Sequence, residues 1–175
     1  MALNKFKTTY ILIAIFIILF LFVYFYEKDR VIVDENEVET HQVIQLDQEN
    51  IKKIKFSYED KTTIVIKDND KWQITKPIKY QARTQKIEEV ITELNNLESE
   101  QKFMAENISE YGLDDPTTQI DVTTNDDENI KIMLGNLNPQ QNKVYLMTSL
   151  DDEIYLVDST SENRLRLNDE VLKEE

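Results

Sequence analysis

The sequence predicts an α+β domain of antiparallel β-meanders, packed with one long amphipathic helix and short helices, after an N-terminal single transmembrane helix. Three observations support this: an uncharged apolar run near the N-terminus, two series of short alternating segments between polar turns, and one stretch with apolar residues at helical spacing. Separate runs of strands and helices are typical of α+β domains with antiparallel sheets. We expect about seven short strands, counted from period-two alternation.

The apolar run occupies residues 8–26 and reads TTYILIAIFIILFLFVYFY, without a charge, a proline or a glycine. A helix of this length covers roughly 28 Å, close to the ~30 Å hydrocarbon core of a bilayer. We therefore expect this segment to contact the lipid bilayer as a transmembrane helix. Residues 1–7 carry Lys5 and Lys7, so this end is expected to be cytoplasmic and the remaining chain extracytoplasmic, in an inner or plasma membrane.

Two alternatives to an uncleaved anchor fit this run less well. A cleaved signal peptide needs a shorter apolar core and a cleavage site with small residues, but the run ends in YFYEKDR. A buried helix of a soluble domain is rarely apolar on all sides. The sequence has no cysteine, which excludes lipoprotein processing, disulfides and thiolate metal sites.

Charge and motifs exclude several functions for the exterior part. The formal net charge is −14 for the whole chain and −16 without residues 1–26, which hold two lysines and no acidic residue, so nucleic-acid binding is not expected. The sequence contains no phosphate loop and no dinucleotide fingerprint. Its only histidine, His41, ends an acidic stalk at 27–41 and has no serine or cysteine motif around it, which argues against a nucleophilic triad. The predicted exterior domain spans 42–168, and 169–175 is read as an acidic C-terminal tail.

The first meander comprises the segments IKKIKFSY, TTIVIK and KWQIT, in which apolar and polar residues alternate. Pro77 ends this run because proline cannot donate a ladder hydrogen bond. Trp72, the only tryptophan, is expected to anchor the core between sheet and helix, and the alternative is an exposed contact for a partner.

The next segment, TQKIEEVITELNNL, predicts the long helix, with Thr84 as its N-cap. Its apolar residues at helical spacing are Ile87, Val90, Ile91, Leu94 and Leu97. A second series, TTQIDVTT, NIKIML, KVYLMT and EIYLV, precedes a short helix at SENRLRL, so the domain reads as two similar halves. Tyr145 and Tyr155 lie on adjacent predicted strands and are expected to pair across the sheet.

The segment AENISEYGLDDP contains one of only two glycines in the chain. Asn107 is expected to cap one short helical turn, and Gly112 to end it in the left-handed conformation. Leu113 then supplies the apolar contact of such a cap, and Pro116 prevents continuation of the helix. The second glycine, Gly135, is expected to end a strand at positive φ.

Acidic residues cluster in three turns: Asp114 with Asp115, residues 126–128, and residues 151–153. Oxygen ligands on loops suit calcium, but none of the three clusters has the spacing of an EF-hand. Aspartate also favours turns through local hydrogen bonds, which is the preferred interpretation here. No cofactor, catalytic or metal-binding residue is predicted, although carboxylates that meet only in the folded state stay open as a glycosidase-type pair.

The apolar anchor, DKWQITKP, the amphipathic helix, YGLDDP, IMLG, KVYLM and EIYLV together resemble the bacterial domain-of-unknown-function family 4340, over roughly residues 42–168. One departure is Ala82-Arg83, where the family often has Ala-Asp before the long helix. The resemblance implies a membrane-anchored extracytoplasmic protein, in some cases found beside ABC-type transporters, and it brings no catalytic residue. The positions shared with the family pattern are structural: Trp72, Pro77, Gly112, Leu113, Pro116 and Gly135.

These observations favour a non-enzymatic accessory or scaffold protein that presents a β-rich exterior surface to a membrane protein partner. The family resemblance makes subunits of an ABC-type transporter the first candidate partner. The alternative is a small domain that binds or hydrolyses envelope glycan with acidic residues. That alternative requires polar groups that converge in a pocket.

Overall fold

The computed structural model describes residue 10, residues 15–22 and residues 39–173. The chain forms two compact units, Met1–Val38 and Glu39–Glu175.

The first unit contains helical residues at Tyr10 and at 15–22, with exposed side chains. Among the residues that the structure describes, no helix is long and apolar enough to cross a membrane. The rest of the apolar segment 8–26, the N-terminal residues 1–7 and stalk residues 27–38 lie outside the described residues.

The second unit is mostly β, which corrects the predicted fold class. A single antiparallel sheet has nine strands in the order β5-β4-β3-β2-β8-β9-β10-β11-β7, whereas separate meanders of about seven strands were expected. The helices have only 12, 7 and 4 residues. The predicted α+β fold class was therefore wrong, because the strands of both meanders join one sheet that dominates the domain. The predicted transmembrane helix is not found among the described residues.

The strands of the large sheet are β2 (Ile51–Tyr58), β3 (Lys61–Asp68), β4 (Lys71–Lys76), β5 (Tyr80–Gln81), β7 (Lys102–Phe103), β8 (Thr118–Thr124), β9 (Asn129–Leu137), β10 (Lys143–Thr148) and β11 (Ile154–Asp158). A second sheet pairs β1 (His41–Gln42) with β6 (Glu98–Ser99). The helices are α2 (Thr84–Asn95), α3 (Ser159–Leu165) and α4 (Asp169–Leu172), with 3-10 turns η1 (Gln48–Asn50) and η2 (Ile108–Tyr111).

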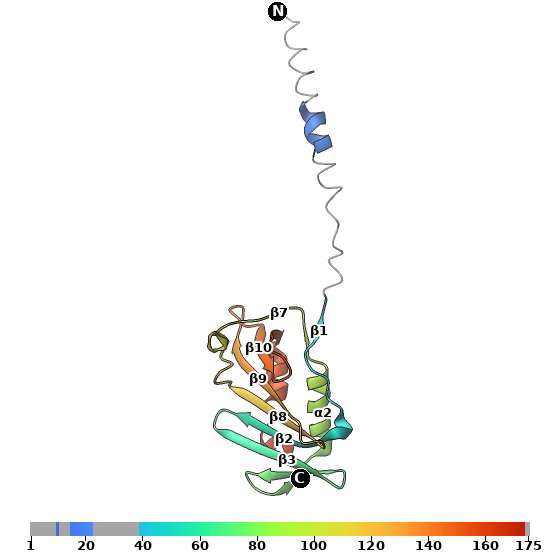
Figure 1. The fold of residues 1–175 in the computed structure, drawn as a ribbon, viewed down its shortest axis with the longest axis vertical. Helices are drawn as coiled ribbons and strands as arrows, with labels where there is room; N and C mark the ends of the chain where they lie inside the picture. The colour runs from blue at the N-terminus through green and yellow to red at the C-terminus, as the bar shows by residue number, and fades with distance from the viewer. Residues whose placement is uncertain (1–9, 11–14, 23–38, 174–175) are drawn as a thin grey trace, which may run out of the picture. The chain divides into compact units, whose positions relative to one another are not determined.

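The large sheet consists of two similar halves that meet at its centre (Figure 1). In each half a meander is followed by a helix: β2 to β5 precede α2, and β8 to β11 precede α3. The first strands of the halves, β2 and β8, pair with each other in antiparallel register, with Ile54 opposite Val122 and Lys55 opposite Asp121. The described residues thus show the repeated order of strands and helix that the sequence suggested.

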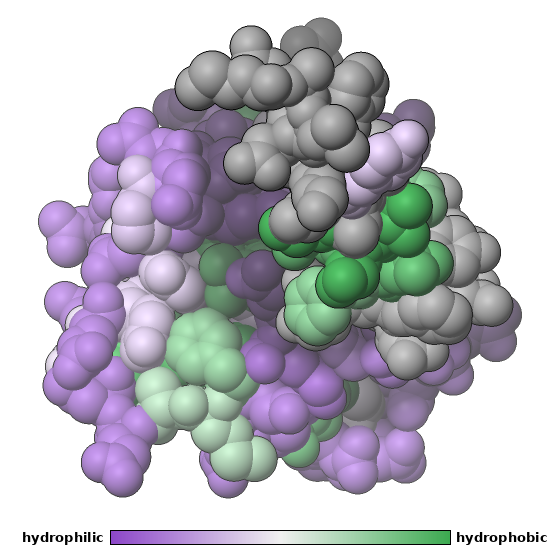
Figure 2. Space-filling model, turned by 90° about the horizontal axis from the view of Figure 1, so that it is seen from above, coloured by the Kyte–Doolittle hydropathy of each residue, from purple (hydrophilic) through white to green (hydrophobic). Residues whose placement is uncertain are grey.

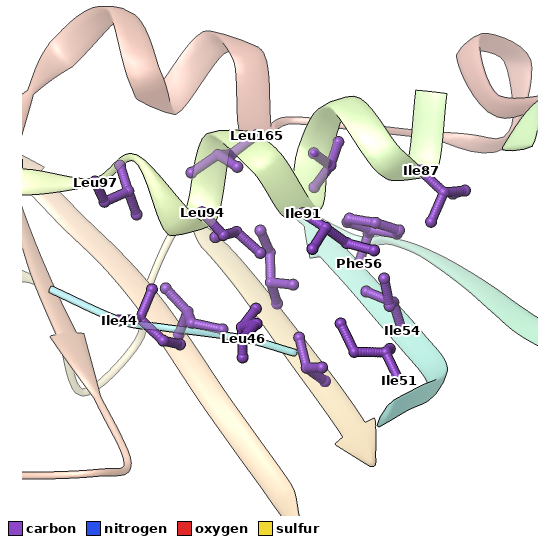
Figure 3. Packing of buried hydrophobic residues seen from close by; sticks show 14 of the residues in the cluster. Ile44, Leu46, Ile51, Ile54, Phe56, Ile87, Ile91, Leu94, Leu97 and Leu165 are labelled. Carbon is purple, nitrogen blue, oxygen red and sulfur yellow. The ribbon is translucent and has the colours of Figure 1, made fainter. Parts of the chain in front are cut away.

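One face of the sheet carries the hydrophobic core. Side chains alternate between the faces of a strand, so Ile54 and Phe56 point to the same side as their cross-strand neighbours Val122 and Ile120. Helix α2 covers this face, as Figure 3 shows. Its fully or nearly fully buried residues are those at helical spacing: Ile87, Val90, Ile91 and Leu94. The opposite face of the central strands carries polar residues such as Lys55, Asp121 and Lys131. Figure 2 looks from above and not onto this face, and hydrophilic residues cover much of the described surface in that view.

The chain before β2 also belongs to the domain. His41, expected in the stalk, lies in β1 opposite Ser99 of β6. The following residues Val43, Ile44 and Leu46 are buried in the core. Asn95, at the end of α2, holds this segment by two hydrogen bonds: its Oδ1 accepts from the Leu46 N–H at 2.6 Å, and its Nδ2 donates to the Leu46 carbonyl at 3.0 Å.

The C-terminal segment packs back onto the start of α2. Leu172 of α4 is fully buried, and its carbonyl accepts the Arg83 N–H at 2.8 Å. Lys173 forms a β-bridge with Ala82. The predicted tail at 169–175 is therefore part of the fold up to residue 173. The expected cap of α2 also differs, because Thr84 is the first helical residue and the capping position belongs to Arg83, without a side-chain cap hydrogen bond.

Asp158 caps the N-terminus of α3. Its carboxylate accepts hydrogen bonds from the Thr160 N–H at 2.8 Å and the Thr160 hydroxyl at 2.7 Å. The hydroxyl bond first, and the backbone bond second, lower the pKa of Asp158 below its ordinary value of 3.8. The charged form of the cap is thus the one that the folded state favours.

We predict that Asp158→Ala lowers the free energy of unfolding by about 1 kcal/mol at pH 7, a typical N-cap effect. Because the folded pKa is depressed, the charge-dependent part of this contribution is present above the unfolded pKa and is lost as the pH falls through the folded pKa. The difference in free energy of unfolding between the wild-type chain and Asp158→Ala should therefore shrink below about pH 4. Urea unfolding followed by Trp72 fluorescence at pH 7 and pH 3 measures it. Asp158→Asn, which keeps a capping oxygen, is the control, and a pH-independent deficit in the alanine variant would contradict the assignment.

Candidate functional site

A groove of about 670 Å³ lies between α2 and the C-terminal segment that contains α3 and α4. Apolar side chains from three places line it: Val90 of α2, Leu167 between the two C-terminal helices, and Val171 of α4. Val90 is buried, Leu167 is partly buried and Val171 is 42% exposed. The apolar side chains of the groove therefore range from buried to exposed.

One wall of the groove is the outward, polar face of the amphipathic helix α2. Because residues 87, 90, 91 and 94 face the sheet, the intervening polar residues of the helix face outward. Gln85, Glu88, Glu89 and Thr92 are exposed along the groove. The other wall comes from Asn163 and Arg164 of α3.

Charged side chains form the rim of the groove and bridge its two walls. Arg164 of α3 contacts Glu93 of α2, with Nη2 2.9 Å from Oε1. Along α2, the Lys86 ammonium lies 2.5 Å from Glu89 Oε2, and this hydrogen bond lowers the pKa of Glu89. Such exposed pairs add little to stability, but they orient charge around the apolar floor. Among the described residues, no ion pair involves Glu88 of the same rim.

Helix α3 is held in place by a buried ion pair. The Glu162 carboxylate accepts a hydrogen bond from Arg166 one turn later and another from the Thr117 hydroxyl at 3.4 Å. The Glu162 side chain is 7% exposed, and the Arg166 guanidinium also lies 4.8 Å from the ring centroid of Tyr58. This cluster ties α3 to the end of β2 and the start of β8, and so fixes one wall of the groove.

The residues predicted as structural do not gather at the groove. Trp72 is 3% exposed in the core, which agrees with its preferred interpretation as an anchor. Pro77 directly follows the end of β4, and Pro116 lies just before β8. Leu113 is 1% exposed.

The two glycines lie close together in the folded chain, and the sequence did not predict this proximity. Gly112 ends η2 at φ 70°, in the left-handed conformation expected for it, and Asn107 caps the same turn. Gly135 instead lies inside β9, and Gly112 is the only described glycine with positive φ, so the expectation for Gly135 was wrong. A Cβ at Gly135 would lie 2.1 Å from the carbonyl oxygen of Tyr111. Glycine is needed there because the η2 backbone crosses β9 without room for a side chain.

The expected pairing of Tyr145 with Tyr155 is also wrong. In the register of β10 and β11, Tyr145 lies opposite Leu156, and Tyr155 lies opposite Leu146. The two tyrosines therefore point to opposite faces of the sheet. Tyr145 packs edge to face with Phe103 and Tyr111, at centroid distances of 6.3 and 4.8 Å.

Two of the three acidic turns form ion pairs with lysines that are distant in the sequence. Asp127 pairs with Lys52 at 2.7 Å, and Glu153 pairs with Lys102 at 2.6 Å, which lowers the pKa of Glu153. Asp151 accepts the Tyr155 hydroxyl at 2.7 Å, and burial followed by this bond raises the pKa of that tyrosine. Among the described residues, no group of three or more histidine, aspartate or glutamate side chains is arranged to hold a metal ion.

The fold and the groove define a class: a β-rich domain with a helical layer on one face and a partly apolar groove along that layer. The chain matches the family described as Domain of unknown function (DUF4340) over residues 26–101 and 72–174. It therefore belongs to this family, as the resemblance of its motifs indicated. Comparison with curated proteins and with solved structures gave no match.

Proposed function

We propose that this protein is a non-enzymatic accessory subunit of a membrane assembly, and that it docks on its partner through the groove between α2 and the C-terminal helices. The observation that carries the proposal is the groove itself, an apolar floor of Val90, Leu167 and Val171 within a charged rim. A partly exposed apolar floor gains free energy when a partner side chain covers it, and rim charges then select the partner.

The negative charge of the chain indicates which kind of partner segment the groove would bind. With a formal net charge of −14 and an exposed Glu88 on the rim, the protein favours a segment with basic residues beside its apolar ones. An amphipathic helix or extended segment of a membrane protein meets this description. The resemblance noted above makes a subunit of an ABC-type transporter the first candidate.

Attachment to the membrane is the second part of the proposal. It rests on the apolar sequence of residues 8–26, whose 19 residues contain no charge. The lysines at positions 5 and 7 favour a cytoplasmic N-terminus and an extracytoplasmic domain. Membrane attachment would place the groove at the cell envelope, where a membrane partner is at high effective concentration.

The test is site-specific photo-crosslinking of the full chain in native membranes. A photoreactive residue at Val171, in the groove, should give one discrete product with a membrane protein. The same residue at Ile78, which is 60% exposed and outside the groove, is the control. Glu88→Lys should reduce the Val171 product about fivefold, the effect of roughly 1 kcal/mol on affinity.

Two outcomes would contradict the proposal. Equal products from Val171 and Ile78 would show that the groove is not the docking surface. Recovery of the chain in the soluble fraction, or protection of its domain from protease added outside spheroplasts, would contradict the location.

A further inference from the structure

The polar face of the sheet, opposite α2, carries a cluster of three half-buried lysines at its centre. Lys53 and Lys55 of β2 and Lys131 of β9 surround a hollow of about 290 Å³, together with side chains of β8 that lie between them. This hollow is far larger than the ~30 Å³ share of one water molecule. The lysines stand out in a chain with a formal net charge of −14.

Strand register brings these residues together. Asp121 of β8 lies directly opposite Lys55 on one side and directly opposite Lys131 on the other, so the three form one row across the sheet. The neighbouring row on the same face contains Lys53, Thr123 and Asn129. Adjacent strands are about 4.8 Å apart, so the flexible side chains of β2 and β9 can converge above β8.

Neutralisation of Asp121 does not explain all three lysines. Lys55 pairs with the Asp121 carboxylate at 3.0 Å, and Gln119 donates to both of its oxygens at 2.9 and 3.0 Å. The carboxylate is thus already neutralised and hydrogen bonded, with its side chain 12% exposed. Among the described residues, no hydrogen bond or ion pair engages the ammonium groups of Lys53 and Lys131. Two unpaired positive charges remain beside the hollow.

We propose that this hollow is a binding site for a dianionic phosphate group, either as free phosphate or on a soluble monoester. Two unpaired ammonium groups match two negative charges, whereas a single carboxylate would leave one of them uncompensated. Asn129, which also lines the hollow, can donate from its amide nitrogen to the remaining oxygens, while its Oδ1 accepts the Thr123 hydroxyl at 3.4 Å. The site lies on the opposite side of the sheet from the groove, so it is independent of the docking surface proposed above.

The test is a titration of the full chain, in an uncharged detergent, with inorganic phosphate at constant ionic strength. Proton–nitrogen NMR spectra should show saturable shifts confined to the central strands around Lys53, Thr123 and Lys131. The double variant Lys53→Gln with Lys131→Gln should raise the dissociation constant at least tenfold. The matched control, Lys71→Gln with Lys79→Gln, removes two exposed lysines outside the hollow and should leave it unchanged.

A second titration with glycerol 3-phosphate distinguishes the two sources of the group. Equal or tighter binding of the ester identifies a soluble monoester as the ligand type, and binding of inorganic phosphate alone identifies free phosphate. Shifts that fail to saturate, or that are equal in the double variant and the wild-type chain, would overturn the site.

Discussion

Gly135→Ala is expected to destabilise the domain by about 3 kcal/mol or more, at the upper end of what overpacking costs. The added Cβ would meet the Tyr111 carbonyl oxygen at 2.1 Å and the backbone of Gly112 at 3.0 Å. Both neighbours are backbone, so neither can rotate away as a side chain would. Relief of the contact requires η2 to separate from β9. Chemical unfolding followed by the fluorescence of Trp72, the only tryptophan, measures the loss.

Gly112→Ala is the matched comparison for this variant. Here the positive φ of 70° costs about 1 to 2 kcal/mol for a residue with a Cβ. The three atoms nearest to the new Cβ all belong to the side chain of Asn136, at 2.7 to 2.9 Å, and this side chain is exposed and can move. The expected order of stability is therefore wild type, then Gly112→Ala, then Gly135→Ala. An unchanged unfolding midpoint for the Gly135 variant would show that η2 does not pack on β9 as described.

Glu162→Ala is expected to lower the free energy of unfolding by about 3 kcal/mol, the low end for breaking a buried ion pair. The Glu162 side chain is 7% exposed, so its loss leaves Arg166 without its carboxylate partner. Arg166 is 30% exposed and can turn partly toward water, which is why the low end applies. Removal of the pair should also loosen α3, one wall of the proposed docking groove.

The control for this variant is Glu170→Ala, on the exposed side of α4, with an expected effect within about 0.5 kcal/mol. Denaturant unfolding of both proteins measures the difference. In the double variant Glu162→Ala with Arg166→Ala, the total loss should be smaller than the sum of the single losses, because the unpaired charge is gone. Additive losses would argue that the two residues do not act as a pair.

Features that depend on neighbours in the chain were predictable. The buried face of α2 follows from apolar residues three and four positions apart, and the packing of Ile87, Ile91 and Leu94 agrees with it. The left-handed Gly112 follows from a cap motif contained within a few residues. The repeated order of a meander and then a helix could also be read, because turns and alternation are local signals.

Features that depend on which strands meet were not predictable. Pairing of β2 with β8 converts two expected meanders into one sheet, and nothing within either segment specifies that partner. The same pairing creates the row of Lys55, Asp121 and Lys131 from residues that are isolated in the sequence. A register offset of one residue places Tyr145 and Tyr155 on opposite faces, and a distant crossing of η2 over β9 gives Gly135 its role.

The sequence by itself determined the local elements: alternating strands, an amphipathic helix with a specified buried face, a glycine cap, and an acidic chain with one long apolar segment near its N-terminus. Only the tertiary structure decided that the domain is mostly β, that Leu172 closes the core, and that a groove and a lysine cluster lie on opposite sides of one sheet. The physical reason is the separation along the chain of the residues that interact. Helical spacing, capping and turns depend on interactions between near neighbours, whereas strand partners, register and close backbone approach depend on contacts between residues far apart in the chain.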